Sequence, residues 1–246
     1  MASAWNPDPW HGELITSFVE SSATQGVDEF GRTVELELYR KRTSQNYGIA
    51  GLTKRIALVG AFDWQDAQIV GPALDVAFRA PSKIEAGLQY QIHRSERRAV
   101  ALSLSYLDGV ELPAALLTLE GRRDRAELRG LWGENYRLLG RDGFIEAQLA
   151  GRMEFGGRIS GSRAQLSAGI KPWWRTEVIV KGRYARQEDG AIGEFALRGQ
   201  QRWEAEALAA INVWKDAYLE IGYQGTVAAD NAVLERGYKL GMWTKF

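Results

Sequence analysis

Few residues of this 246-residue chain could carry out nucleophilic or metal chemistry. The sequence has no cysteine and two histidines, which excludes disulfides, thiolate metal sites and multi-histidine metal sites. His93 stands close to Ser95, Ser103 and Ser105, and nucleophilic catalysis needs a hydroxyl positioned beside a base. The alternation around His93 puts its side chain on the polar face of its segment, next to a turn, where a lining role is more common. We therefore expect no catalytic site, no metal site and no cofactor, in a protein that is not an enzyme.

The charged side chains alternate with apolar residues along most of the chain. In Ile84–His93, Leu88 and Tyr90 belong to the apolar set, whereas Glu85 and Gln89 belong to the polar set. A β-strand directs successive side chains to opposite faces, so each such segment has one apolar and one polar face. About 12 segments fit this pattern, at about 20 residues each with their connections. They are Glu13–Glu20, Thr33–Gly51, Ile56–Trp64, Ile84–His93, Arg98–Tyr106, Ala126–Asn135, Phe144–Phe155, Ser162–Lys171, Thr176–Arg186, Glu194–Val213, Leu219–Gln224 and Asn231–Phe246.

Two long segments, Asp66–Lys83 and Leu107–Arg125, contain prolines and are predicted to be loops. Splitting both would give about 14 strands as an alternative, with Asp75–Arg79 as one added strand. A shift of the alternation near Thr43–Asn46 predicts a β-bulge. The sequence therefore favours an all-β fold whose strand count depends on these segments.

The end of the chain has the same alternation and stops on an aromatic residue. Tyr238, Leu240, Met242 and Phe246 fall on one side, and Thr244 departs from the apolar pattern. With the charged strand centres, this resembles a bacterial outer-membrane β-barrel and its C-terminal insertion signal. The resemblance implies a transmembrane, antiparallel, up-and-down barrel, apolar toward lipid and polar toward the lumen. It also implies outer-membrane lipid and the barrel-assembly machinery as partners.

Composition agrees with a barrel and limits other functions. No apolar run approaches the roughly 18 residues that a membrane helix needs. The formal net charge is +0, so we expect no nucleic-acid partner. Trp 9 and Tyr 9 are enough to supply aromatic belts at two membrane interfaces. No linker or clear repeat divides the chain, so residues 1–246 are predicted to form one domain, with residues 1–11 as an extended lead-in.

The connections between the predicted strands alternate in length. Arg94–Arg97, Pro172–Arg175 and Trp214–Asp216 are short, whereas Asp66–Lys83 and Leu107–Arg125 are long. Outer-membrane barrels have short periplasmic turns and longer external loops. With an even number of strands, both termini then fall on the periplasmic side.

The first residues bear on localisation. Residues 1–10 lack the apolar core of a signal peptide, yet Ala2-Ser3-Ala4 has the small-residue form of a cleavage site. Our expectation is an outer-membrane protein that begins near its mature N-terminus after signal removal. Ala-Ser-Ala as ordinary linker sequence is the equal alternative.

The polar face of the predicted barrel carries acids and bases in similar number, and the bases of the chain are mostly arginine, 23 Arg to 8 Lys. Planar guanidinium groups suit pairing with carboxylates on neighbouring strands. The predicted lumen-lining residues are Glu85, Gln89, Glu127, Arg129, Glu146, Arg152, Arg163, Glu177, Lys181, Arg183, Arg198, Arg202, Glu220 and Lys239.

Two functions follow from such a lumen, and one alternative fold has no lumen. Separated charges would line a water-filled channel for small polar solutes or ions, which we favour because glycine and serine among the inward positions leave room. A densely paired interior would instead make a non-conducting barrel that supports or docks another envelope protein, or a second copy of this chain. A soluble β-sandwich would place the apolar faces of two sheets together.

Overall fold

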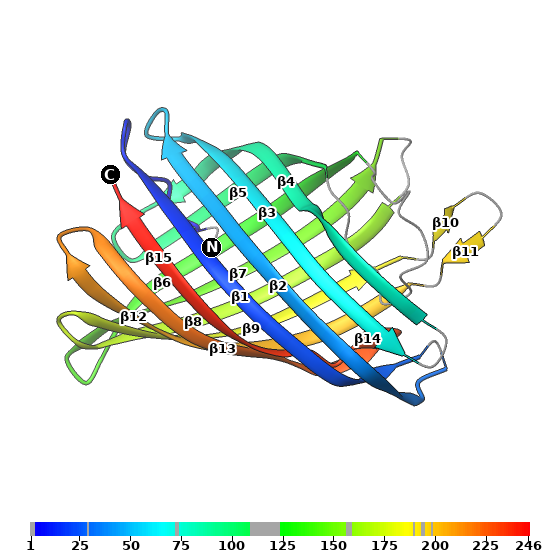
Figure 1. Ribbon diagram of the computed structural model, residues 1–246. Coiled ribbons are helices and arrows are strands. Elements are labelled where there is room, and N and C mark those ends of the chain that lie inside the picture. The colour runs from blue at the N-terminus through cyan, green and yellow to red at the C-terminus, as the bar shows by residue number, and fades with distance from the viewer. Residues whose placement is uncertain are drawn as a thin grey trace.

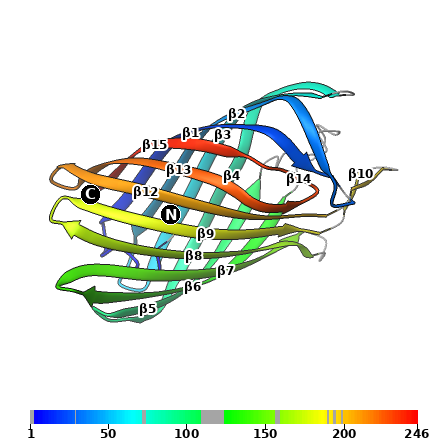
Figure 2. The ribbon, with the colours of Figure 1, turned by 90° about the horizontal axis from the view of Figure 1, so that it is seen from below.

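The computed structural model describes residues 3–28, 30–71, 74–108, 124–155, 159–188, 190–192, 195–197 and 199–246. Twelve antiparallel strands form a closed barrel (Figures 1 and 2). Within the described part of the chain, no helix is long and apolar enough to cross a membrane. The barrel strands are β1 (Gly12–Val27), β2 (Thr33–Gly51), β3 (Ile56–Gly71), β4 (Leu74–Arg94), β5 (Arg98–Asp108), β6 (Arg125–Leu138), β7 (Arg141–Glu154), β8 (Ile159–Trp173), β9 (Thr176–Gln187), β12 (Gln200–Trp214), β13 (Ala217–Asp230) and β15 (Arg236–Lys245).

Closure of the barrel depends on β1, which pairs with both β2 and β15. Phe18 lies opposite Ser44 on one side and opposite Leu240 on the other. The two ends of the chain meet here, because Gly12 and Phe246 exchange backbone hydrogen bonds of 2.8 and 3.0 Å. The barrel therefore leaves no open edge among these twelve strands, and their backbone groups are satisfied within the sheet.

The two ends of the barrel differ in their connections. Tight turns, including Leu139-Gly140 and Lys215-Asp216, lie at the end of the barrel where Gly12 and Phe246 meet (Figure 1). Leu139 and Gly140 have φ values of 50° and 76°, as a two-residue hairpin turn between twisted strands requires. At the opposite end, β10 (Gly190–Ile192) and β11 (Phe195–Leu197) pair as a separate short hairpin, and β14 (Ala232–Val233) pairs with β1. We call these the turn end and the loop end.

Several details of the sequence prediction were wrong. Asp66–Lys83 is not a loop, since β3 runs to Gly71 and β4 begins at Leu74. Pro81 is accommodated next to a bulge, because Asp63 and Trp64 lie opposite Lys83 and Pro81 and leave Ser82 as the extra residue.

The prediction of a β-bulge at Thr43–Asn46 was also wrong. Strand β2 pairs with β3 in continuous register from Leu38 to Gly51. The irregularity lies nearer the loop end of the β1–β2 pair, where Ala23 faces Tyr39 and Gln25 faces Glu35, so that the extra residues are on β2.

Two further predicted segments differ from the structure in extent. One is only partly described, and the other is divided between two strands. In Leu107–Arg125, β5 ends at Asp108 and β6 begins at Arg125, and residues 109–123 lie outside the described residues. The predicted strand Glu194–Val213 is divided, because its first part belongs to β11 and the barrel strand β12 begins at Gln200.

Burial is inverted relative to a water-soluble protein. Large apolar side chains are exposed on the outer face, among them Leu88 at 52% and Leu149 at 69%. Polar side chains are buried inside, among them Gln89 at 0% and Glu127 at 1%. An exposed apolar surface that surrounds a polar interior fits a lipid environment and excludes the alternative of a β-sandwich with its apolar faces packed together.

This inversion predicts how arginine is tolerated on each face. Leu149→Arg is expected to lower the free energy of unfolding by about 2–4 kcal/mol, the cost of a guanidinium near the bilayer midplane. Gln148→Arg, one residue away and facing the cavity within the barrel, is the matched control and should cost less. Urea unfolding of both variants in lipid vesicles, followed by β-type circular dichroism, measures the difference. Equal costs would contradict the assignment of the two faces.

Candidate functional site: the charged lumen

The barrel strands bring the predicted lumen-lining residues together from segments far apart in sequence. The described members of this set lie on the inner face, since they share strand alternation with buried neighbours. Arg198 lies outside the described residues. Nine of them line one cavity: Glu85, Glu127, Arg129, Arg152, Arg163, Lys181, Arg183, Arg202 and Lys239. Gln89, Glu146, Glu177 and Glu220 lie elsewhere on the inner face.

One ion-pair network spans β4, β6 and β7. The buried carboxylate of Glu127 accepts a hydrogen bond of 2.7 Å from Arg152 and pairs with Arg129. Arg129 also reaches Glu85, at 3.2 Å, and Lys83 reaches the same carboxylate at 2.6 Å. Facing positions on adjacent strands bring these side chains within reach, as for Glu127 opposite Arg152. Sequence reasoning missed Lys83, because it assigned that residue to a loop.

A second network lies across β9, β12, β13 and β15. Glu206 accepts hydrogen bonds from Lys181 at 3.1 Å and Lys239 at 3.3 Å, and pairs with Arg183. Lys239 also reaches Glu220 at 2.7 Å. The Glu206 side chain is 1% exposed, so its charge is compensated by three bases rather than by bulk water.

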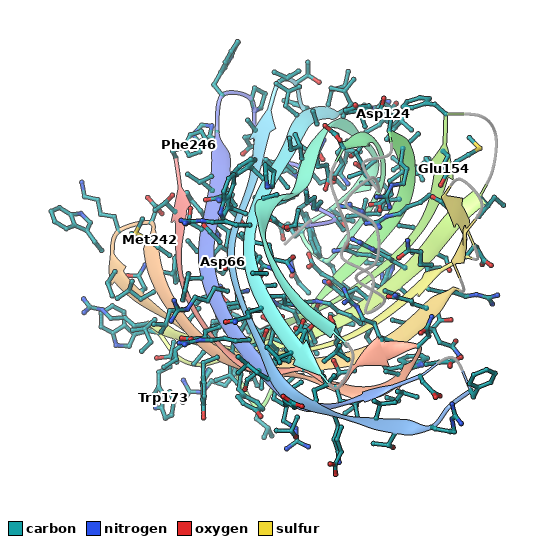
Figure 3. All side chains as sticks on the ribbon, turned by 45° about the vertical axis from the view of Figure 1, so that its right-hand side comes forward. Asp66, Asp124, Glu154, Trp173, Met242 and Phe246 are labelled. Atoms are coloured by element: carbon teal, nitrogen blue, oxygen red, sulfur yellow. The ribbon has the colours of Figure 1, made fainter. Side chains whose placement is uncertain are left out.

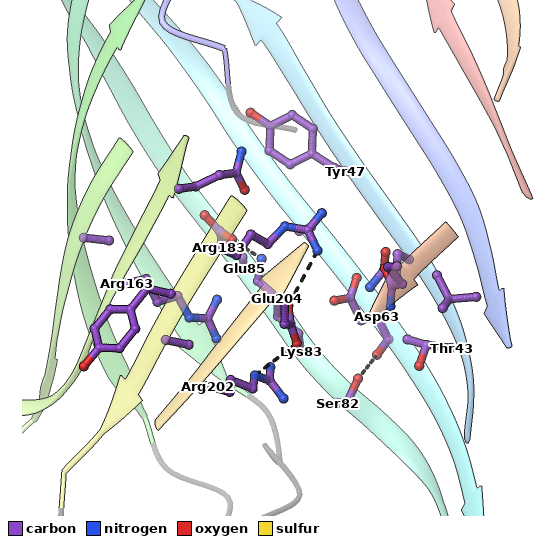
Figure 4. Close-up of a pocket in the computed structure, with 18 of the residues that line it drawn as sticks. Thr43, Tyr47, Asp63, Ser82, Lys83, Glu85, Arg163, Arg183, Arg202 and Glu204 are labelled. Carbon is purple, nitrogen blue, oxygen red and sulfur yellow. Dashed lines mark hydrogen bonds and ion pairs between the residues drawn. The ribbon is translucent and has the colours of Figure 1, made fainter. Parts of the chain in front are cut away.

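The lumen contains a cavity of about 420 Å³ on the loop-end side of these networks. Its lining comes from opposite walls of the barrel, including Asp63 and Lys83 on one side and Arg183 and Arg202 on another (Figure 4). It reaches Gln187 and Gln200, which are the strand ends at the loop end. The cavity therefore continues toward the loop-end mouth of the barrel.

The N-terminal segment enters the barrel at the turn end, a feature that the alternation of the strands did not signal. Ala4 and Asn6 are each 1% exposed. The Asn6 backbone N–H donates to Gln91 at 2.7 Å, and the Gln89 side chain donates to the Ser3 carbonyl at 2.8 Å. The segment is thus held on the inner wall of β4 by side-chain amides.

Further contacts fix this segment against β5, β6 and β7. The Ser3 hydroxyl donates to Glu146 at 3.0 Å. The Trp5 ring covers Gly133, where a Cβ atom would lie 2.2 Å from the ring. Ala4 packs with Leu131 in an apolar cluster that also contains Ala99 and Ala101. Small and apolar inner positions at the turn end therefore accommodate the segment, whereas charged positions surround the cavity.

His93 and the C-terminal residues lie outside the lumen, whereas Ser103 and Ser105 are buried on its inner wall. His93 was predicted to face inward, and this was wrong. A register shift between Gln91 and His93 places His93 opposite Val100, on the outer face, where it is exposed. A bulge reverses the side on which following residues emerge, and the alternation read from sequence does not show it.

Aromatic residues gather near both margins of the apolar outer surface. Trp173 and Trp214 are exposed at the turn end, at 64% and 71%. Toward the loop end, Tyr223 and Tyr238 pack edge to face at 5.3 Å between ring centroids. Trp173 lies at the outer margin of the barrel, away from the lumen (Figure 3). This is the distribution of membrane-interface belts.

The C-terminal residues predicted as an insertion signal lie on the outer face of β15 or just beyond it. Tyr238, Leu240 and Met242 are exposed at 71%, 58% and 50%. Phe246 covers Gly12, where a Cβ atom would lie 2.4 Å from the phenyl ring. The apolar stripe therefore borders the β1–β15 seam at which the barrel closes.

The comparisons with known proteins agree with this architecture. No protein-family model matches the chain, and no curated protein matches it in sequence. The structure is similar to an outer membrane channel from Pseudomonas putida F1, with a TM-score of 0.74, 12% identity, and coverage of 100% of this chain and 99% of that one. It is also similar to the translocator domain of autotransporter NalP from Neisseria meningitidis, with a TM-score of 0.57, 9% identity, and coverage of 97% and 90%. The NanC porin gives a TM-score of 0.52 at 9% identity, with coverage of 95% and 100%.

These likenesses show the fold. The protein is a closed, antiparallel, twelve-stranded β-barrel of the kind found in bacterial outer membranes. The resemblance stated from the sequence is confirmed at that level, and the strand count is twelve rather than the alternative of fourteen.

The shared carboxylate of the second network predicts a stability effect. Glu206→Gln leaves Lys181, Lys239 and Arg183 without their common partner and is expected to destabilise the barrel by about 3 kcal/mol. Glu134→Gln, which removes a carboxylate paired with turn arginines, is the control and should change stability little. Urea unfolding and heat-modifiable gel migration report the difference. Equal stability of both variants would show that the network contributes nothing.

Proposed function

We propose that this chain is an outer-membrane channel through which small polar solutes or ions pass along the charged lumen. The observation that carries the proposal is a cavity of about 420 Å³ inside an apolar-coated barrel, lined largely by charged and amide side chains. A folded chain that only needed a stable interior would fill this space with side chains. A polar lining instead lowers the cost of moving a hydrated solute through the barrel.

The N-terminal segment is the constriction in this proposal. Ser3, Ala4 and Asn6 occupy the lumen between the cavity and the turn end, and none of them lines the cavity. A solute that enters from the loop end would meet the segment after it leaves the charged region. The segment would therefore limit the conductance of the channel. The charged cavity would determine which small polar solutes or ions pass through it.

Deleting residues 2–8 tests this division of roles. The deletion removes the contacts to Gln89, Gln91 and Glu146 and is expected to raise single-channel conductance several-fold in planar bilayers. Trp10→Ala is the matched control, because Trp10 is 84% exposed, and its conductance should equal that of the wild type. Absence of conductance from every form, with folding verified by heat-modifiable migration, would contradict the channel proposal.

The second candidate function is a non-conducting barrel that docks another envelope protein or a second copy of the chain. The N-terminal segment favours it, because this segment and three apolar clusters occupy inner positions at the turn end. On this alternative the wild type does not conduct, and only the deletion variant does. The bilayer recordings therefore decide between the two functions.

We further propose that the turn end and both termini are periplasmic and that the chain resides in the outer membrane. Support comes from the tight turns at that end, as in outer-membrane barrels. We assign outer-membrane lipid as the partner of the apolar outer surface. We assign the barrel-assembly machinery as the partner of the C-terminal stripe of Tyr238, Leu240, Met242 and Phe246.

The chain contains no cysteine, so single cysteines can report the orientation. Phe30→Cys lies at the loop end and is expected to react with an impermeant maleimide on intact cells, whereas Lys215→Cys at the turn end should not. Both should react after the outer membrane is permeabilised, which controls for thiol accessibility. Labelling of Lys215→Cys alone on intact cells would reverse the proposed orientation.

A further inference from the structure

Acids and bases do not contribute equally to the surface of the cavity. Among the described residues, its lining contains ten basic side chains and five acidic ones. The bases are Lys41, Lys83, Arg129, Arg152, Arg163, Lys181, Arg183, Arg186, Arg202 and Lys239. The acids are Asp63, Glu85, Glu127, Glu204 and Glu235. Glu206 and Glu220, which complete the ion pairs of the second network, are not part of the lining.

The charged side chains of the lining differ in burial. The carboxylates of Glu206 and Glu127 are each 1% exposed, whereas the side chains of Arg183 and Arg202 are 30% and 43% exposed. At these two positions the guanidinium group meets the water of the cavity, whereas Arg152, Lys181 and Lys239 are buried in the wall with the carboxylates that they pair with. Glu204 is 25% exposed and lies between Arg183 and Arg202. A solute in the cavity therefore experiences mainly positive charge.

Three arginines surround one small residue in the lining of the cavity. Ala185 on β9 lies opposite Arg163 on β8 and opposite Arg202 on β12. Arg183 is two positions before Ala185 and faces the same way along β9. All four residues line the cavity, and the three arginines reach it from neighbouring strands (Figure 4). Because the Ala185 side chain is only a methyl group, it leaves space on the cavity side of the wall. This space lies between the three longer arginine side chains.

We propose that Arg163, Arg183 and Arg202 form a binding site for the oxyanion of a small solute, a carboxylate or a phosphate group, in front of Ala185. A guanidinium carries five N–H donors in a planar fork, so each arginine can keep its contacts within the wall and still donate to a passing oxyanion. The glutamates hold the guanidinium planes in place, as Glu204 does for Arg183 at 3.8 Å and Arg202 at 3.2 Å. This inference rests on the proposed channel, and it makes that channel selective for anions.

The first test measures ion selectivity in planar bilayers under a KCl gradient. The wild type is expected to have a chloride-to-potassium permeability ratio above one. The triple variant Arg163→Gln, Arg183→Gln, Arg202→Gln should bring it below one, a change of roughly threefold or more. The matched control removes three turn-end arginines, Arg97→Gln, Arg137→Gln and Arg175→Gln, and should keep the wild-type ratio. If the first triple variant does not fold, Arg163→Gln alone should shift the ratio in the same direction.

A second measurement does not depend on conduction. The arginine Nε–H signals of the protein in detergent micelles are titrated with inorganic phosphate and, separately, with acetate. The signals of Arg163, Arg183 and Arg202 should shift with at least one of these anions. Ala185→Leu fills the space between them at constant charge, so it should retain anion selectivity in KCl but lose these shifts.

The outcomes separate the site from the channel. Conductance that favours cations, or that the lumen triple variant leaves unchanged, overturns the oxyanion site and leaves the channel in place. Arginine shifts in a barrel that never conducts support the oxyanion site and overturn the channel. Absence of both conductance and arginine shifts overturns both.

Discussion

A bilayer offers no hydrogen-bond partners to a backbone, and this constraint determines the rest of the structure. The chain meets it by pairing β1 with both β2 and β15, so that no strand of the barrel is left at an edge. Gly12 and Phe246 join the two ends of the chain at this seam. Once the sheet is closed, alternate residues must face lipid and lumen. The apolar belt and the polar interior both follow from that geometry.

The polar interior must compensate its buried charges, because burying a charge without a partner costs free energy. Neighbouring strands do so by setting acids beside bases, as Glu127 does with Arg129 and Arg152. At Arg183 the guanidinium group is exposed to the cavity, whereas the carboxylate of Glu206 with which it pairs is buried. Stability and the electrostatic character of the lumen thus have the same physical origin. A substitution in either ion-pair network changes both of these properties.

The two ends of the lumen are built differently. Around the cavity many inner positions are charged, whereas the turn end also has small and apolar inner positions, such as Ala99, Ala101 and Leu131. The N-terminal segment occupies the second region through amide contacts from Gln89 and Gln91. Ala4 and Trp5 add apolar contacts with the same wall. In the proposed channel this segment is the constriction.

The sequence alone determined the class of fold and the two faces of each strand. Apolar and polar residues alternate along whole strands because alternate side chains face lipid and the polar lumen. It indicated Glu85, Arg152 and Lys239 as inward residues for the same reason. It did not determine where the pattern is interrupted. The bulge that turns His93 outward and the strand pairing that absorbs Pro81 depend on partners distant in sequence. Only the tertiary structure placed the N-terminal segment inside the barrel and grouped three arginines around Ala185, since such positions arise from the register between strands, which local alternation does not encode.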